Sequence, residues 1–224
     1  ALACLGRAAE VLAVHSEVSD AERCVEPDLS SGVVARFDHA SLRYADDDED
    51  TLRNLDFSVR RGQVCAIIGN TGSGKSTVAK MLLRFCDATE GRVLLGDADV
   101  RDVSQQTLRE HVAYVPQKAW LFSGTIAENL RHGRAEATDE ELWHALDVAQ
   151  AGFVRELPDG LGARVAQGGT NFSGGQRQRV AIARALVRHA DLYVFDDSFS
   201  ALDFKTDASL RHALAPELAR AATL

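Results

Sequence analysis

A glycine-rich stretch at residues 69–77 constrains the fold more than any other part of the sequence. It follows an apolar run at 64–68 and precedes a second apolar run at 78–83, so the sequence predicts the order strand, loop, helix. The stretch consists of Gly69, Asn70, Thr71, Gly72, Ser73, Gly74, Lys75, Ser76 and Thr77. Glycines let such a loop turn its backbone N–H groups inward, and the following helix adds the partial positive charge of its N-terminus. The sequence therefore predicts a phosphate-binding loop, called the phosphate loop below.

Two side chains of the phosphate loop and one distant carboxylate are expected to bind a nucleoside triphosphate with its metal ion. Lys75 should contact the β- and γ-phosphates, and the Ser76 hydroxyl should bind Mg²⁺. The apolar run at 192–195 predicts a strand that ends in Asp196, whose carboxylate should complete the Mg²⁺ site. A simple connecting turn is the alternative, but it does not explain why Lys75 and Ser76 occur at these offsets from the glycines.

Composition narrows the class of protein. The 224 residues are 46% hydrophobic and 26% charged, which is typical of a globular chain with a sizeable core. The net charge of −8, without a long basic run, argues against DNA or RNA as a partner, since phosphate backbones attract clustered Lys and Arg. The four cysteines lack metal-ligand spacing and are expected to be free thiols.

Hydrophobic periodicity predicts a mixture of strand types and helices. Alternation between residues 33 and 59 indicates short antiparallel strands, and further strands are expected at 91–96 and 112–115. Thr138 and Glu141 form a capping-box pattern at the start of one helix, and a second helix is expected at 173–188. The apolar stretch at 1–18 is too short and too polar to span a bilayer.

Six motifs resemble those of ATP-binding cassette (ABC) proteins. The first two are the phosphate loop and the strand ending in Asp196. Tyr44 matches the aromatic residue that stacks on adenine, and Gln117 matches the loop glutamine that serves catalysis and the metal ion. The signature segment is similar to the family's signature sequence, although Leu more often stands first, and it consists of Phe172, Ser173, Gly174, Gly175 and Gln176. Asp203 ends a segment at 200–203 that resembles the dimer-contacting loop.

The resemblance implies a fold, cofactors and a partner. The fold would be α/β, with a P-loop NTPase (RecA-like) core, an antiparallel β lobe and an inserted helical lobe. The cofactors would be ATP and Mg²⁺. Because Ser173 and the two following glycines lie at a helix N-terminus, they would form a second anion site. Each ATP would then bind between the phosphate loop of one cassette and the signature segment of a second cassette, arranged head to tail.

The stretch at 117–130 looks like the exporter version of the region where the helical lobe meets the membrane domain. Residues 1–32 would be the end of a transmembrane-domain helix and a linker. Residues 33–224 would be the nucleotide-binding domain, with the helical lobe at about 117–190 and the chain ending before the switch loop. The chain would work at the cytoplasmic face of the cell membrane, with the transmembrane domain of the same transporter as its partner.

One position departs from the family pattern. Asp197 stands where active cassettes usually carry a Glu as general base, so the resemblance assigns Asp197 the catalytic role beside Gln117 and Lys75. Because Asp is shorter than Glu, we expect a slow site in a heterodimer of half-transporters, and a homodimer served by Asp197 is the alternative. Two other classes of protein stay open: a soluble ABC ATPase that acts on ribosomes or DNA, and a regulatory module that binds nucleotide without hydrolysis.

Overall fold

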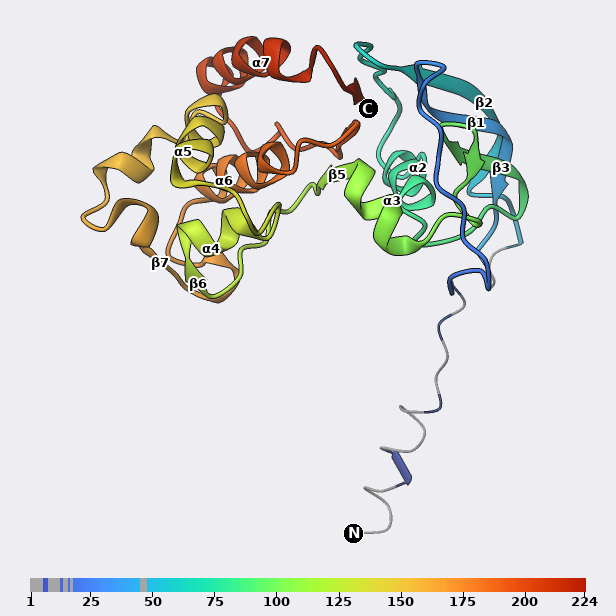
Figure 1. Ribbon diagram of the computed structural model, residues 1–224, viewed down its shortest axis with the longest axis horizontal. Coiled ribbons are helices and arrows are strands. Elements are labelled where there is room, and N and C mark those ends of the chain that lie inside the picture. Colours follow the sequence, from blue (N-terminus) through green and yellow to red (C-terminus); the bar gives the residue numbers. More distant parts are fainter. Residues whose placement is uncertain (1–5, 8–12, 14–15, 17, 45–47) are drawn as a thin grey trace.

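A computed structural model of the chain describes residues 6–7, 13, 16, 18–44 and 48–224. The elements form two groups with β5 (Val112–Val115) between them, as Figure 1 shows. One group contains the antiparallel strands with helices α2 (Lys75–Leu82) and α3 (Gln105–His111), and the other contains the later helices, α4 to α7. The site described below lies where β5 and its neighbour β8 (Leu192–Phe195) end.

The predicted antiparallel strands are confirmed. Four strands form a sheet in the order β2-β1-β3-β4, and they are β1 (Val33–Leu42), β2 (Leu52–Arg60), β3 (Glu90–Leu95) and β4 (Ala98–Asp99). Phe37 and Phe57 lie opposite each other in the β1–β2 register, and their rings stack at a centroid distance of 4.7 Å. The alternating apolar residues of these strands pack on α2, so this sheet and helix share one core.

A parallel sheet carries the two strands that lead to the candidate site. Its order is β5-β8-β9, with β9 at Ala222–Thr223. Val112 and Leu192 pack into the core that contains α2, whereas Ala113 and Tyr193 pack into the core formed by the helices. Both faces of β5 and β8 are therefore covered, as expected for parallel strands.

The predicted strand at 64–68 is wrong for most of its length. Val64 forms a single parallel bridge with Thr223, and the Cys65 N–H donates to the Thr223 carbonyl at 2.8 Å. The pairing of this segment ends at Cys65, and residues 66–68 belong to no strand. As a result Val64 and Ile68 are 76% and 91% exposed.

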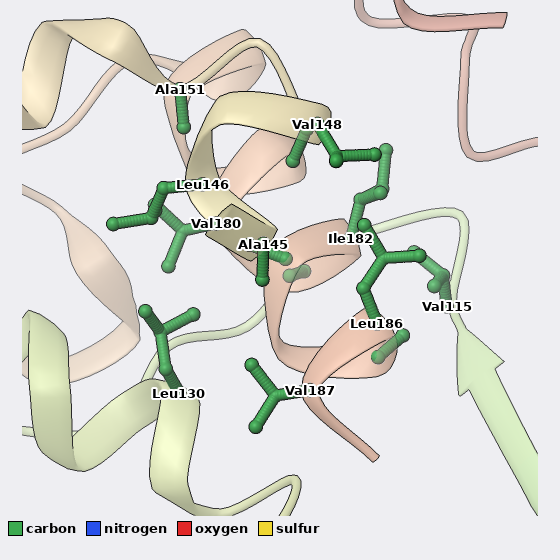
Figure 2. Packing of buried hydrophobic residues seen from close by; sticks show 14 of the residues in the cluster. Val115, Leu130, Ala145, Leu146, Val148, Ala151, Val180, Ile182, Leu186 and Val187 are labelled. Carbon is green, nitrogen blue, oxygen red and sulfur yellow. The ribbon is translucent and has the colours of Figure 1, made fainter. Parts of the chain in front are cut away.

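The helical group packs around α6 (Gly174–Val187). Leu130 of α4 (Ile126–Arg131), Leu146 of α5 (Asp139–Val148) and Val180 of α6 are buried together, as Figure 2 shows. The predicted capping box of Thr138 and Glu141 is present at the start of α5.

The remaining elements are α7 (Phe204–Leu218), β6 (Gly124–Thr125), β7 (Arg164–Val165) and short 3₁₀ turns at Gly152–Glu156, Gly160–Gly162 and Gln167–Gly169.

Within the described part of the chain, no helix is both long enough and apolar enough to cross a bilayer. Most of residues 1–18 lie outside the described residues. The expected end of a transmembrane-domain helix at 1–32 therefore stays a prediction.

Charged side chains join the parallel sheet to neighbouring segments at the N-terminal end of β8. Asp191, just before β8, accepts hydrogen bonds from Arg61 at 2.7 Å and from His111 at 2.7 Å. Arg61 also donates to the carbonyl of Arg220 at 2.8 Å. Burial raises the pKa of Asp191, but the hydrogen bonds from His111 and Arg61 outweigh burial and hold this pKa below its ordinary value.

The lowered pKa of Asp191 predicts a pH-dependent contribution to stability. The unfolded carboxyl titrates near pH 4, so the stabilisation is complete above that pH and is lost as the pH falls through the lower folded pKa. We expect Asp191→Asn to lower the free energy of unfolding at pH 7 and to flatten its decline below about pH 5. Urea unfolding between pH 3 and 7 measures both effects, and parallel pH curves for variant and wild type would contradict them.

Candidate nucleotide site

The phosphate loop has a backbone shaped by two glycines. Gly72 and Gly74 both have φ of +84°, a left-handed conformation that glycine adopts at little cost. A Cβ on Gly74 would lie 2.6 Å from Leu52 Cδ2, so the start of β2 also excludes a side chain here. Gly74 is the N-cap of α2, and no side chain caps this helix. The N-terminus of α2 is thus open to an anion.

The lysine of the loop is bonded to the loop itself. Lys75 Nζ donates to the carbonyls of Gly69 at 2.8 Å and Asn70 at 2.7 Å. The Asn70 carbonyl also accepts from the Ser73 N–H at 3.2 Å. The loop therefore keeps its cation beside the open end of α2.

Ser76 and Asp196 are brought together from positions 120 residues apart. The Ser76 hydroxyl donates to Asp196 Oδ1 at 2.9 Å, and the Asp196 N–H donates to the Val115 carbonyl at 3.0 Å. The second carboxylate oxygen, Oδ2, accepts from the hydroxyl of Tyr114 at 3.1 Å. Burial, followed by the nearby charge of Asp196, raises the pKa of Tyr114 to about 12.

Gln117 and Asp197 form a second pair beside the first. The Gln117 side-chain nitrogen donates to Asp197 Oδ2 at 3.0 Å, which leaves the amide oxygen of Gln117 available as a metal ligand. Asp197 has φ of +48°, a left-handed conformation in which Asp is among the better tolerated residues. The two acids that follow β8 are therefore each bonded to a side chain from β5 or from the segment after it.

Sequence reasoning did not find Tyr114. In the register of β5 with β8, Tyr114 lies opposite Val194, and Asp196 is two residues further along. Side chains two apart in a strand point to the same face, so the Tyr114 ring can reach Asp196 along the sheet. The proximity of Tyr114 and Asp196 depends on the register in which β5 and β8 pair, and the sequence does not give that register.

The donor set fits Mg²⁺ and a polyphosphate. The Ser76 hydroxyl, the Asp196 carboxylate and the Gln117 amide are hard oxygen donors of the kind that Mg²⁺ prefers. Among the described residues, no group of three His, Cys, Asp or Glu could hold a metal ion alone. Mg²⁺ is commonly bound by one or two carboxylates together with phosphate oxygens, and Asp196 supplies one such carboxylate beside the phosphate loop.

The signature segment faces solvent. Ser173 caps α6 in a capping box, in which its hydroxyl accepts from the Gln176 N–H at 3.2 Å and its own N–H donates to Gln176 Oε1 at 2.9 Å. Ser173 and Gly174 are exposed, and a Cβ on Gly174 would meet nothing within 4 Å. A Cβ on Gly175 would lie 3.4 Å from the carbonyl of Ala201, so this helix start adjoins the predicted dimer-contacting loop.

The other predicted site residues lie apart from the cluster around Asp196. Asp203 caps α7 and accepts from the N–H and hydroxyl of Thr206 at 3.0 and 2.7 Å, and these hydrogen bonds lower its pKa. Tyr44 follows the end of β1, is 37% exposed and lines a different cavity of about 670 Å³ with Arg84. The structure therefore brings together Lys75, Ser76, Gln117, Asp196 and Asp197, but not Tyr44, Ser173 or Asp203.

The chain matches one protein-family model over most of its length. The family model described as "ABC transporter" matches residues 52–200, which contain the phosphate loop, the signature segment and both acids after β8. The chain belongs to the ABC transporter family. The α/β fold with a sheet-containing core, expected from the resemblance, is thereby confirmed.

Relatives of this ABC transporter chain include exporters. It is 45% identical over 215 residues to an uncharacterized ABC transporter ATP-binding protein of Mycobacterium tuberculosis, covering 94% of the chain and 37% of that protein. It is 42% identical over 183 residues to the mitochondrial iron-sulfur clusters transporter Atm1 of Aspergillus fumigatus, covering 81% of the chain and 25% of that protein. A solved structure of a bacterial Atm1-family ABC exporter with ATP bound matches with a TM-score of 0.89 and 34% identity.

The ABC transporter chain is shorter than the proteins it matches. The structural match covers 99% of the chain but 39% of the solved exporter chain. The chain thus spans less than two fifths of the length of these relatives.

Proposed function

We propose that this chain binds ATP and Mg²⁺ at the phosphate loop and hydrolyses ATP to power export across a membrane. The observation that carries the proposal is the hydrogen bond of 2.9 Å from Ser76 to Asp196, which joins the start of α2 to the end of β8. Lys75 would bind the phosphates, and Ser76, Asp196 and Gln117 would hold Mg²⁺, which supplies charge neutralisation at the phosphates. Tyr44 would stack on the adenine, and Asp197 would take the proton of the attacking water.

The second part of the proposal is that a second cassette completes each ATP site. Gly174 is the first residue of α6 and is exposed. A Cβ there would meet no neighbouring atom within 4 Å in the described chain, so packing within the chain does not explain the glycine. An exposed helix N-terminus without a side chain instead suits a phosphate that approaches from outside. Ser173 and Gly174, with Asp203 nearby, would therefore face the ATP bound by the partner cassette.

The third part of the proposal is a heterodimer in which the phosphate loop of this chain forms the slower site. The side chain of Asp is shorter than that of Glu by one C–C bond, ~1.5 Å. A misplacement of about 1 Å can cost roughly 100-fold in rate, so Asp197 would be a poorly placed base. The binding residues Lys75, Ser76 and Asp196 are all present, so ATP would still bind and still hold the two cassettes together.

The fourth part of the proposal is the attachment to a membrane domain. We assign residues 33–224 to the nucleotide-binding domain and about 117–190 to the helical lobe, with residues 1–32 leading from a transmembrane helix. The exporter-like stretch supports a docking surface, because Trp120 and Phe122 are 55% and 49% exposed. A chain docked there would lie at the cytoplasmic face of the membrane.

Lys75→Ala tests the binding site directly. Hydrogen bonds to charged groups contribute about 1.5–3 kcal/mol, so removal of the Lys75 ammonium should weaken ATP–Mg²⁺ binding by roughly 10- to 100-fold. The affinity of the purified chain for a fluorescent ATP analogue, measured by titration, gives the result. Lys80→Ala is the matched control, because Lys80 is an exposed lysine on the same helix. Equal affinities of the Lys75→Ala and Lys80→Ala variants would refute the site assignment.

A further inference from the structure

Tyr114 is bonded to the carboxylate that we propose as a Mg²⁺ ligand, and no motif assigns it a role. Its hydroxyl donates to Asp196 Oδ2 at 3.1 Å while the Ser76 hydroxyl donates to Asp196 Oδ1 at 2.9 Å. Each carboxylate oxygen of Asp196 thus receives one side-chain donor from a different element. Tyr114 comes from β5, and Ser76 comes from α2.

The position of Tyr114 is fixed by packing. Its ring is half-buried and packs on the core that contains Val112, Val194 and the apolar face of α2. In the parallel register Tyr114 lies opposite Val194, and Val112 lies opposite Leu192. Because the ring is held by this core, its hydroxyl is placed beside Asp196 without the entropy cost that a free side chain would have.

We propose that Tyr114 is a positioning residue that orients Asp196 for Mg²⁺, because it holds Oδ2 while Oδ1 faces the Ser76 hydroxyl. This inference rests on the proposed nucleotide site. A neutral donor is suited to the task, because it fixes the orientation of the carboxylate without adding a positive charge beside the metal ion. Outer-shell partners of this kind typically change metal affinity by about 10- to 100-fold when they are removed.

Tyr114→Phe removes the hydroxyl and keeps the ring. We expect the Mg²⁺ concentration that half-saturates Mg²⁺-dependent binding of a fluorescent ATP analogue to rise about tenfold. Affinity for the same analogue in EDTA should change less than about twofold, because the phosphate loop and Lys75 are untouched. A merely structural role of Tyr114 would lower both affinities together. The thermal midpoint of the ligand-free chain, measured in parallel, reports any loss of folding.

Tyr193→Phe is the matched control, because Tyr193 is a buried tyrosine of the adjacent strand that packs into the core on the opposite face. It should leave the Mg²⁺ dependence unchanged. In an Asp196→Asn background, Tyr114→Phe should have no further effect on the Mg²⁺ dependence, because the carboxylate that it orients is gone. If wild type and Tyr114→Phe show the same Mg²⁺ dependence, the inference is wrong while the nucleotide site stands. A wild-type chain without Mg²⁺-dependent nucleotide binding would overturn both.

Discussion

Replacing Ser173 with arginine in the full-length transporter is expected to lower ATP hydrolysis by about 100-fold or more. Ser173 precedes the exposed Gly174 at the start of α6, where we propose that the γ-phosphate bound by the partner cassette makes contact. The arginine side chain would fill that space and remove the oxygen that caps the helix. Phosphate release by the purified transporter measures the loss.

Asp197→Asn in the same transporter separates the two models of the dimer. In the heterodimer, the fast site uses the partner's base and the signature segment of this chain, so most of the hydrolysis should remain. If Asp197→Asn silences the transporter as completely as Ser173→Arg does, then Asp197 is the working base and the asymmetric model fails.

Gly174→Ala controls for misfolding in the signature segment. The added methyl group meets no neighbouring atom within 4 Å, so it should not disturb the packing of α6. The thermal midpoint should therefore stay the same or rise while hydrolysis falls. A parallel fall of both quantities would indicate a folding defect instead of a lost phosphate contact.

Leu146→Ala is expected to reduce the free energy of unfolding by about 2–5 kcal/mol. Leu146 of α5 is fully buried and lies near Leu130 and Val180 in the core of the helical group, as Figure 2 shows. Truncation to alanine leaves a cavity that α4 and α6 can close only in part. Urea denaturation followed by circular dichroism measures the change.

Leu146→Met keeps most of the side-chain volume and should cost less than about 1.5 kcal/mol. A loss below 1 kcal/mol for Leu146→Ala would show that α5 packs loosely on α6. Nucleotide affinity of the folded Leu146→Ala variant should match wild type, because α2, the helix that follows the phosphate loop, packs into the core on the other face of β5 and β8.

Local sequence patterns predicted the elements that local chemistry determines. The helix after the phosphate loop, the Thr138 capping box and the start of α6 at Ser173 depend on residues within a few positions of one another, and all three are present. The pairing of Ser76 with Asp196 was predicted because two motifs of one site must meet. The sequence could not indicate that Tyr114 reaches the same carboxylate, since this contact depends on the β5–β8 register.

The error at 64–68 has a similar cause. Five apolar residues in a row favour a buried strand, but a strand exists only where a neighbouring backbone pairs with it. Here only Val64 and Cys65 pair with another segment, at Thr223. Composition gives the tendency of a segment to form a strand, whereas backbone pairing with another segment decides which of its residues do so.

The hydrogen bonds of Lys75 to Gly69 and Asn70 have a consequence for the kinetics of binding. Because the loop is held in shape by its own ammonium group, ATP does not have to order a disordered segment on arrival, and association can approach the rate of diffusional encounter. At the proposed site, the phosphates would instead draw Nζ away from two carbonyl oxygens. When the nucleotide leaves, the Gly69 and Asn70 carbonyls would again accept hydrogen bonds from Lys75, and the loop would regain its ligand-free shape.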